Sequence, residues 1–140
     1  MQDRFKFRVY EKDQKIMKEC TQITLDKEQT GSMCDVKGKV TAHLIYQPHY
    51  ILMQCTGLKD KNGKLIYEGD IVKFYSYSFL DAISDRHMKL RIGQVIWNDE
   101  CLKFDVVVNG DAVPDLCKKT DDNQFEVIGN IYENSDLLKE

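Results

Sequence analysis

Three short runs decide the fold: Gly69-Asp-Ile-Val72, Ile92-Gly-Gln-Val-Ile-Trp97 and Leu102-Lys-Phe-Asp-Val-Val-Val108. They are rich in the β-branched and aromatic residues that favour strands. A glycine near the start of each of the first two runs permits a tight bend, and a long loop separates these two runs. This order predicts a mainly β protein with a small SH3-like barrel over residues 67–133 and only short helical turns.

The N-terminal residues predict a β-hairpin that precedes the barrel. Residues 4–9 alternate between basic and apolar side chains. This alternation places Arg4, Lys6 and Arg8 on one face of a strand and the Phe and Val side chains on the other. Residues 16–23 predict the second strand of the hairpin.

The chain between the hairpin and the barrel predicts further strands. Residues 26–39 are polar and contain two glycines, so they predict a loop. Residues 40–46 and 49–56 are the next strand candidates. We expect residues 1–66 to form a β-rich subdomain that packs on the barrel, and residues 134–140 to form a short helix or tail.

Several turns are marked by their own residues. The pair Asn62-Gly63 predicts a type I′ turn, in which both central residues have positive φ, and Asn109-Gly110 predicts a second tight turn. We place Asp99 at a hairpin tip and Gly129 at a bend in the last strand. Asp70 follows a glycine, so we expect its carboxylate to accept hydrogen bonds from turn amides.

Length and charge exclude several classes of protein. A chain of 140 residues with 31% charged residues is typical of one soluble domain. Its net charge of −3 excludes a strongly basic nucleic-acid binder, although it permits a local basic patch. No apolar run is long enough to cross a bilayer, and charges stand where a signal peptide would be apolar. We therefore expect the protein to stay in the cytoplasm where it is made.

No motif for metal, cofactor or catalytic chemistry is present. The five cysteines are irregularly spaced without a Cys-x-x-Cys pair, which predicts reduced thiols rather than zinc ligands or disulfides. Phosphate-binding loops and nucleophile signatures are absent. We expect no cofactor, no metal and no enzymatic activity. A small hydrolase-type enzyme using Asp70, Asp99 or His87 is the weakest alternative.

Two long blocks resemble a known family. They are Leu52-Met-Gln-Cys-Thr-Gly-Leu-Lys-Asp-Lys-Asn-Gly-Lys-Leu-Ile-Tyr-Glu-Gly-Asp-Ile-Val-Lys73 and Phe125-Glu-Val-Ile-Gly-Asn-Ile-Tyr-Glu-Asn134, and both resemble the signature of the YopX-like proteins. Shorter matches near residues 7–11 and 93–97 extend the resemblance over nearly the whole chain. The resemblance implies an SH3-like barrel and a phage or prophage origin. It implies no activity, cofactor or site residue.

One candidate binding surface is basic. Residues 1–18 contain six Lys or Arg and three Asp or Glu. Arg4, Lys6 and Arg8, with Lys12 in the following turn, predict a patch that neutralises phosphates of nucleic acid. The alternative is a solvated strand face whose charges prevent pairing with other strands.

The second candidate surface is aromatic. Tyr75, Tyr77 and Phe79 share one face of a predicted strand, whereas Val72 and Phe74 share the other. One face must lie in the core, and Trp97 is expected there too. If Tyr75, Tyr77 and Phe79 are exposed, they favour an interface with a protein or with a second copy of the chain.

The sequence therefore predicts a non-enzymatic binding module. Protein–protein interaction or self-assembly is the leading hypothesis, with a homo-oligomer as one form of it. A nucleic-acid-associated accessory protein that uses the basic N-terminal segment is the alternative. No membrane partner is expected.

Overall fold

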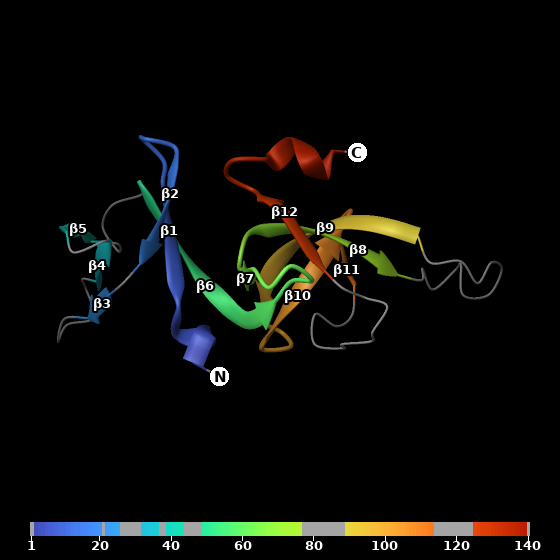
Figure 1. The fold of residues 1–140 in the computed structure, drawn as a ribbon, viewed down its shortest axis with the longest axis horizontal. Coiled ribbons are helices and arrows are strands. Elements are labelled where there is room, and N and C mark those ends of the chain that lie inside the picture. Colours follow the sequence, from blue (N-terminus) through green and yellow to red (C-terminus); the bar gives the residue numbers. More distant parts are fainter. Residues whose placement is uncertain are drawn as a thin grey trace. The chain divides into compact units, whose positions relative to one another are not determined.

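A computed structural model of the chain describes residues 2–20, 22–25, 32–36, 39–43, 49–76, 89–113 and 125–139. The chain forms two compact units, Met1–Gly57 and Leu58–Glu140, which Figure 1 shows in blue to green and in green to red. The sequence placed the corresponding boundary after residue 66. In the described residues, no helix has the length and hydropathy that crossing a membrane requires.

The first unit is built from two antiparallel sheets. Strand β1 lies between β2 and β6, and β4 lies between β3 and β5. The elements are η1 (Gln2–Phe5), β1 (Phe7–Glu11), β2 (Ile16–Cys20), β3 (Gln22–Leu25), β4 (Ser32–Val36), β5 (Lys39–His43) and β6 (Tyr50–Lys59). The predicted hairpin of β1 and β2 is confirmed. Strand β4 lies inside residues 26–39, so the prediction of a loop there is wrong.

The second unit contains a five-stranded antiparallel sheet in the order β11-β10-β9-β8-β12. Its elements are β7 (Leu65–Tyr67), β8 (Asp70–Ser76), β9 (Lys89–Asn98), β10 (Lys103–Val108), β11 (Asp111–Val113), β12 (Glu126–Asn130) and η2 (Ser135–Leu138). The sheet curls into a half-barrel, and β12, the last strand, forms one edge by pairing with β8. The predicted mainly β class with short helical turns is confirmed.

The inner face of the half-barrel carries its core. Six buried apolar residues pack there, namely Ile66, Val72, Phe74, Val95, Phe104 and Val106. Phe74 contacts Phe125 with 4.9 Å between ring centroids. A Cβ on Gly93 would lie 2.7 Å from the carbonyl oxygen of Val107, so only glycine lets β9 approach β10 this closely.

Strand β1 begins later than the alternating pattern predicted. Gln2–Phe5 forms a 3₁₀ turn, in which the amide of Lys6 donates to the carbonyl of Asp3 at 3.1 Å. Phe5 is 81% exposed, so its predicted place on an apolar strand face is wrong. Within β1, which is paired along both edges, the adjacent residues Val9 and Tyr10 are both buried although their side chains point to opposite faces.

Three turns show how local chemistry fixes the chain. Asn109 and Gly110 both have positive φ, as a two-residue I′ turn requires. At Asn62-Gly63 only the glycine has positive φ, so the predicted type I′ turn is wrong. There the carboxylate of Asp60 accepts the amides of Asn62 and Lys64, each at 2.8 Å, and imposes a different loop. The predicted bend at Gly129 is confirmed as a register shift in β12.

Candidate interaction surface

The predicted basic residues lie on three different local structures. Arg4 belongs to the 3₁₀ turn, Lys6 precedes β1 and Lys12 lies in the hairpin turn. Lys6 forms an ion pair with Asp3 at 2.8 Å. The single strand face that was expected to align these cations is therefore absent from the described N-terminal residues. Nucleic-acid binding by these residues stays a prediction.

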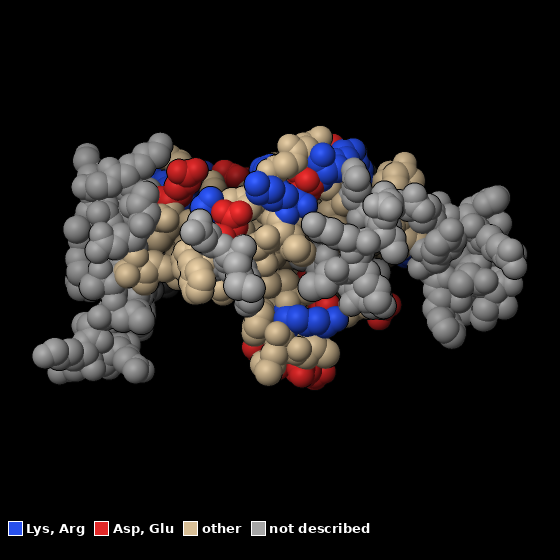
Figure 2. Space-filling view, turned by 60° about the horizontal axis from the view of Figure 1, so that its bottom comes forward, with Lys and Arg blue, Asp and Glu red and all other residues tan. Residues whose placement is uncertain are grey.

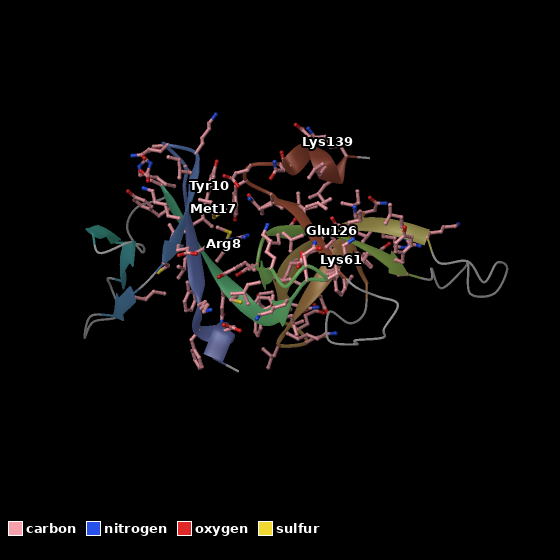
Figure 3. The ribbon with its side chains drawn as sticks, viewed as in Figure 1. Arg8, Tyr10, Met17, Lys61, Glu126 and Lys139 are labelled. Atoms are coloured by element: carbon pink, nitrogen blue, oxygen red, sulfur yellow. The ribbon has the colours of Figure 1, made fainter. Side chains whose placement is uncertain are left out.

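Arg8 lies on β1 and is half-buried. It shares a strand face with the buried Tyr10, which pairs with Met17 across the hairpin (Figure 3). Its guanidinium is 3.7 Å from the sulfur of Met53, itself buried. Arg8 is thus less accessible to a phosphate than the predicted solvent face implied.

The aromatic surface is centred on Tyr75. In β8, Val72 and Phe74 point into the core, while Tyr75 is 50% exposed on the outer face. Leu90 of β9 stands directly opposite Tyr75 in the antiparallel register and is 51% exposed. Cross-strand neighbours have Cβ atoms about 5 Å apart, so these two side chains form one apolar surface. Tyr77 and Phe79 lie outside the described residues.

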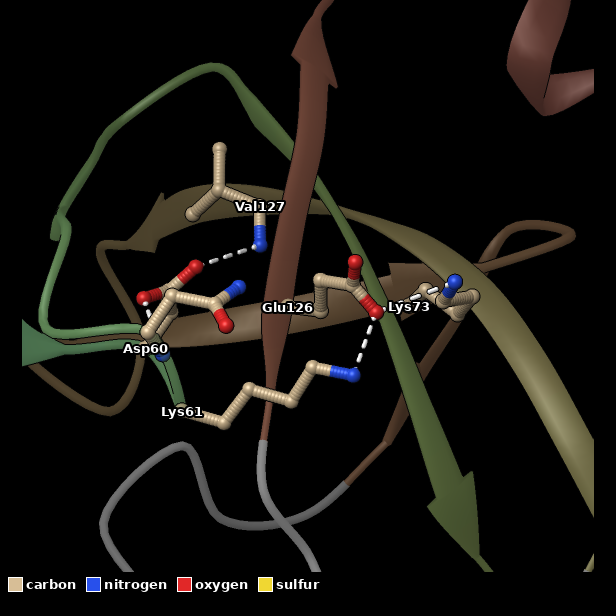
Figure 4. Close-up of polar contacts among 6 residues, drawn as sticks. Asp60, Lys61, Lys73, Glu126 and Val127 are labelled. Atoms are coloured by element: carbon tan, nitrogen blue, oxygen red, sulfur yellow. Dashed lines mark hydrogen bonds and ion pairs between the residues drawn. The ribbon is translucent and has the colours of Figure 1, made fainter.

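Charged residues lie beside this apolar pair. Lys73 lies two residues before Tyr75 on the same strand, and Glu126 of β12 is its cross-strand partner. One oxygen of Glu126 is 2.6 Å from the Nζ of Lys61 and 3.0 Å from the Nζ of Lys73 (Figure 4). Hydrogen bonds from both lysines lower the pKa of Glu126 below its ordinary range, against a smaller opposing effect of burial. We call Tyr75, Leu90, Lys73, Lys61 and Glu126 the outer patch.

Asp60 holds the turn before β7 against β12. One of its oxygens accepts the amide of Val127 at 3.1 Å (Figure 4), and the other accepts the two turn amides. Burial alone would raise the pKa of Asp60, but the amides of Val127, Lys64 and Asn62 outweigh it and lower the pKa.

The other buried carboxylates of the half-barrel also act within the fold. Asp70 accepts the amide of Tyr67 at 2.8 Å, as predicted for a turn carboxylate. Asp105 accepts the side-chain amide of Asn98 at 2.9 Å and pairs with Lys103 at 2.9 Å. Among the described residues, no three His, Cys, Asp or Glu side chains gather as a metal site. His87 lies outside the described residues.

Surface charge is mixed. In the view of Figure 2, the Lys and Arg side chains of the described residues lie next to Asp and Glu side chains. The ion pairs of Lys6 with Asp3 and of Lys61 with Glu126 are examples. Such pairing weakens a long-range attraction to one sign of partner and leaves local contacts to decide binding.

Sequence reasoning missed two exposed leucines. The sequence predicted a long loop before the run that begins at Ile92, so Leu90 was not expected as a strand residue opposite Tyr75. Leu102 was placed in a strand, whereas it is the last residue of the β9–β10 turn and is 74% exposed. Trp97 is 37% exposed rather than fully buried, although it packs edge-on against Phe104 at 5.1 Å.

These features define a mainly β protein with a half-barrel. The family model described as YopX protein matches residues 6–139, and the chain therefore belongs to the YopX family. No curated protein matches the chain.

Two solved structures are similar to the chain. Protein EF1440 from Enterococcus faecalis is 25% identical, with 95% of this chain and 96% of that chain covered and a TM-score of 0.59. Protein yopX from Bacillus subtilis is 20% identical, with 96% and 98% covered and a TM-score of 0.63, and this likeness concerns the fold. The names of both proteins state no activity.

Proposed function

We propose that this protein is a non-enzymatic binding module that recognises protein through the outer patch. The observation that carries the proposal is the Tyr75–Leu90 pair, two large side chains that face each other across two strands and are each about half exposed. A tyrosine beside an aliphatic side chain offers a large contact area at low entropic cost, which is typical of protein interfaces.

The placement of the buried carboxylates supports a role without catalysis. Asp60 and Asp70 accept backbone amides of nearby turns. A general acid or base needs a carboxylate or imidazole that faces a substrate, and these carboxylates face the backbone instead. They are best explained as groups that fix the half-barrel.

We further propose a phage or prophage origin and action in the bacterial cytoplasm. Membership of the YopX family supports the origin. Cys101 is a free and exposed thiol. Free surface thiols persist in the reducing cytoplasm and are uncommon in oxidising compartments.

A position-dependent cross-link tests this function. We would place the photoreactive residue p-benzoylphenylalanine at position 75, irradiate it in a bacterial lysate and look for covalent protein adducts. The matched control carries the same residue at position 16, because Ile16 is 44% exposed on β2, far along the chain from the outer patch. We expect adducts from position 75 and none from position 16. Equal labelling at both positions, or no adduct at position 75, would contradict the proposal.

A further inference from the structure

The tip of the β9–β10 hairpin presents a leucine to solvent. The strands join through residues 99–102, between the paired residues Asn98 and Lys103. Leu102 is 74% exposed and has a positive φ of 52°. Few residues other than Gly, Asn and Asp adopt this left-handed conformation without strain. The tip therefore places an apolar side chain in water at a position where Asn or Gly would be more favourable.

The tip is also well ordered. The side-chain oxygen of Asn98 accepts the amides of Glu100 and Cys101 at 3.0 and 3.2 Å. The Asn98 amide group in turn donates to Asp105, which is buried in β10. A side chain on a pre-ordered turn loses less entropy when it binds than one on a mobile loop. Strain and apolar exposure together on an ordered turn indicate a contact residue.

The tip and the outer patch are complementary. Leu102 is accompanied by Asp99 and Glu100, both exposed. The outer patch offers an apolar pair, Tyr75 and Leu90, beside two lysines that share one carboxylate. Complementary charge around an apolar centre is the arrangement that orients protein partners.

The two surfaces lie at opposite ends of one strand. Leu90 is near the start of β9 and the turn follows its end at Asn98. Eight residues of extended strand span roughly 26 Å at about 3.3 Å per residue. The tip of one molecule therefore cannot reach its own outer patch.

We propose that the β9–β10 tip of one copy docks on the outer patch of a second copy, with Leu102 against Tyr75 and Leu90. This inference rests on the proposed function, of which it names the partner. The two contact surfaces differ, so the contact closes as a reciprocal two-fold dimer, closes as a ring, or continues from copy to copy. In each case the extent of association rises with protein concentration.

Two variants of the full chain test the two surfaces one at a time. In Leu102→Asn the apolar contact is lost, and the fold is kept because asparagine accepts the left-handed conformation. In Tyr75→Glu a new carboxylate faces the acidic tip. Ile16→Asn is the matched control, an equally mild change at an exposed apolar residue outside both surfaces.

The test is sedimentation of each protein up to about 1 mM, a range that detects weak contacts. We expect the wild type and Ile16→Asn to associate with themselves, and each of the other variants to associate at least tenfold more weakly. A mixture of Leu102→Asn and Tyr75→Glu retains one intact tip and one intact patch, so it forms a heterodimer and nothing larger.

A monomeric wild type at 1 mM would overturn the inference, as would association that neither variant reduces. Cross-linking from position 75 then shows whether only the self-association proposal fails or the proposed function fails too. Adducts to a different protein would leave the proposed function standing, and their absence would remove both. If the wild type is monomeric and binds labelled single-stranded DNA in a Tyr75-dependent manner, the outer patch is a nucleic-acid surface and both proposals are wrong.

Discussion

Asp60 connects a turn with the last strand through a single side chain. Its carboxylate accepts three backbone amides, one of them 67 positions further along the chain in β12. Asp60 is 7% exposed, and a buried carboxylate that satisfies several amides is costly to replace. Asp60, which lies in a block that resembles the family signature, thus has a structural role.

The lowered pKa of Asp60 predicts a pH-dependent contribution to stability. A depressed folded pKa stabilises the folded state fully above the unfolded value of about 3.9, and this contribution is lost as pH falls through the folded pKa. We expect Asp60→Asn to lower the free energy of unfolding by about 1–3 kcal/mol at neutral pH. Urea unfolding from pH 7 to pH 3 should show this difference shrinking below about pH 4. A difference that is constant over this range would contradict the assigned role.

A side chain at position 129 should collide with Asn134. A Cβ at this position would lie 2.7 Å from Oδ1 and 2.8 Å from Cβ of Asn134. We expect Gly129→Ala to cost about 1–3 kcal/mol of unfolding free energy, because Asn134 must move. In the Asn134→Gly background the same change should cost less, as measured by a double-mutant cycle. Equal costs in both backgrounds would show that Asn134 is not the obstacle.

At the scale of elements, successive side chains at the end of β8 point alternately into the core and to the surface. Phe74 is 2% exposed and packs against Phe125, whereas its neighbour Tyr75 is half exposed. We expect Phe74→Ala to cost about 3–5 kcal/mol. Tyr75→Ala, the matched change on the other face, should cost less than about 0.5 kcal/mol. Thermal or urea unfolding measures both, and similar losses would mean that the faces are assigned wrongly.

Strands were predictable where local and long-range preferences agree. The runs that became β8, β9 and β10 combine strand-forming residues with marked turns, and their pairing follows the chain order. Residues 4–9 also alternate, yet Asp3 and Lys6 close a 3₁₀ turn that shortens the strand. Leu90 was not expected in a strand for another reason, since the sequence predicted a loop before the run that begins at Ile92. Which face of β8 is exposed depends on distant partners such as Phe125, and no local pattern contains that information.

At the scale of the whole chain, the apolar core is distributed unevenly. In the described residues of the first unit, the buried apolar side chains are Val9, Tyr10, Met53 and Cys55, whereas the second unit has its six-residue core and Ile71. We expect the slowest amide hydrogen exchange in β8, β9 and β10, because opening there exposes the most apolar surface. Exchange followed by NMR or mass spectrometry checks this. Slowest exchange in β1 and β2 would contradict it.

The position of β12 in the chain also governs how the protein is made. Strand β8 is complete by residue 76, but its partner β12 begins only at Glu126, near the end of the sequence. During translation, the edge of β8 that later pairs with β12 is exposed until β12 has been synthesised. The carboxylate of Asp60 likewise lacks the Val127 amide as a donor until then. Long-range pairing of this kind is slow and leaves a strand edge available for wrong association. The half-barrel therefore gains its β12 strand only after residues 126–130 are synthesised, and truncation before residue 126 leaves β8 without this partner.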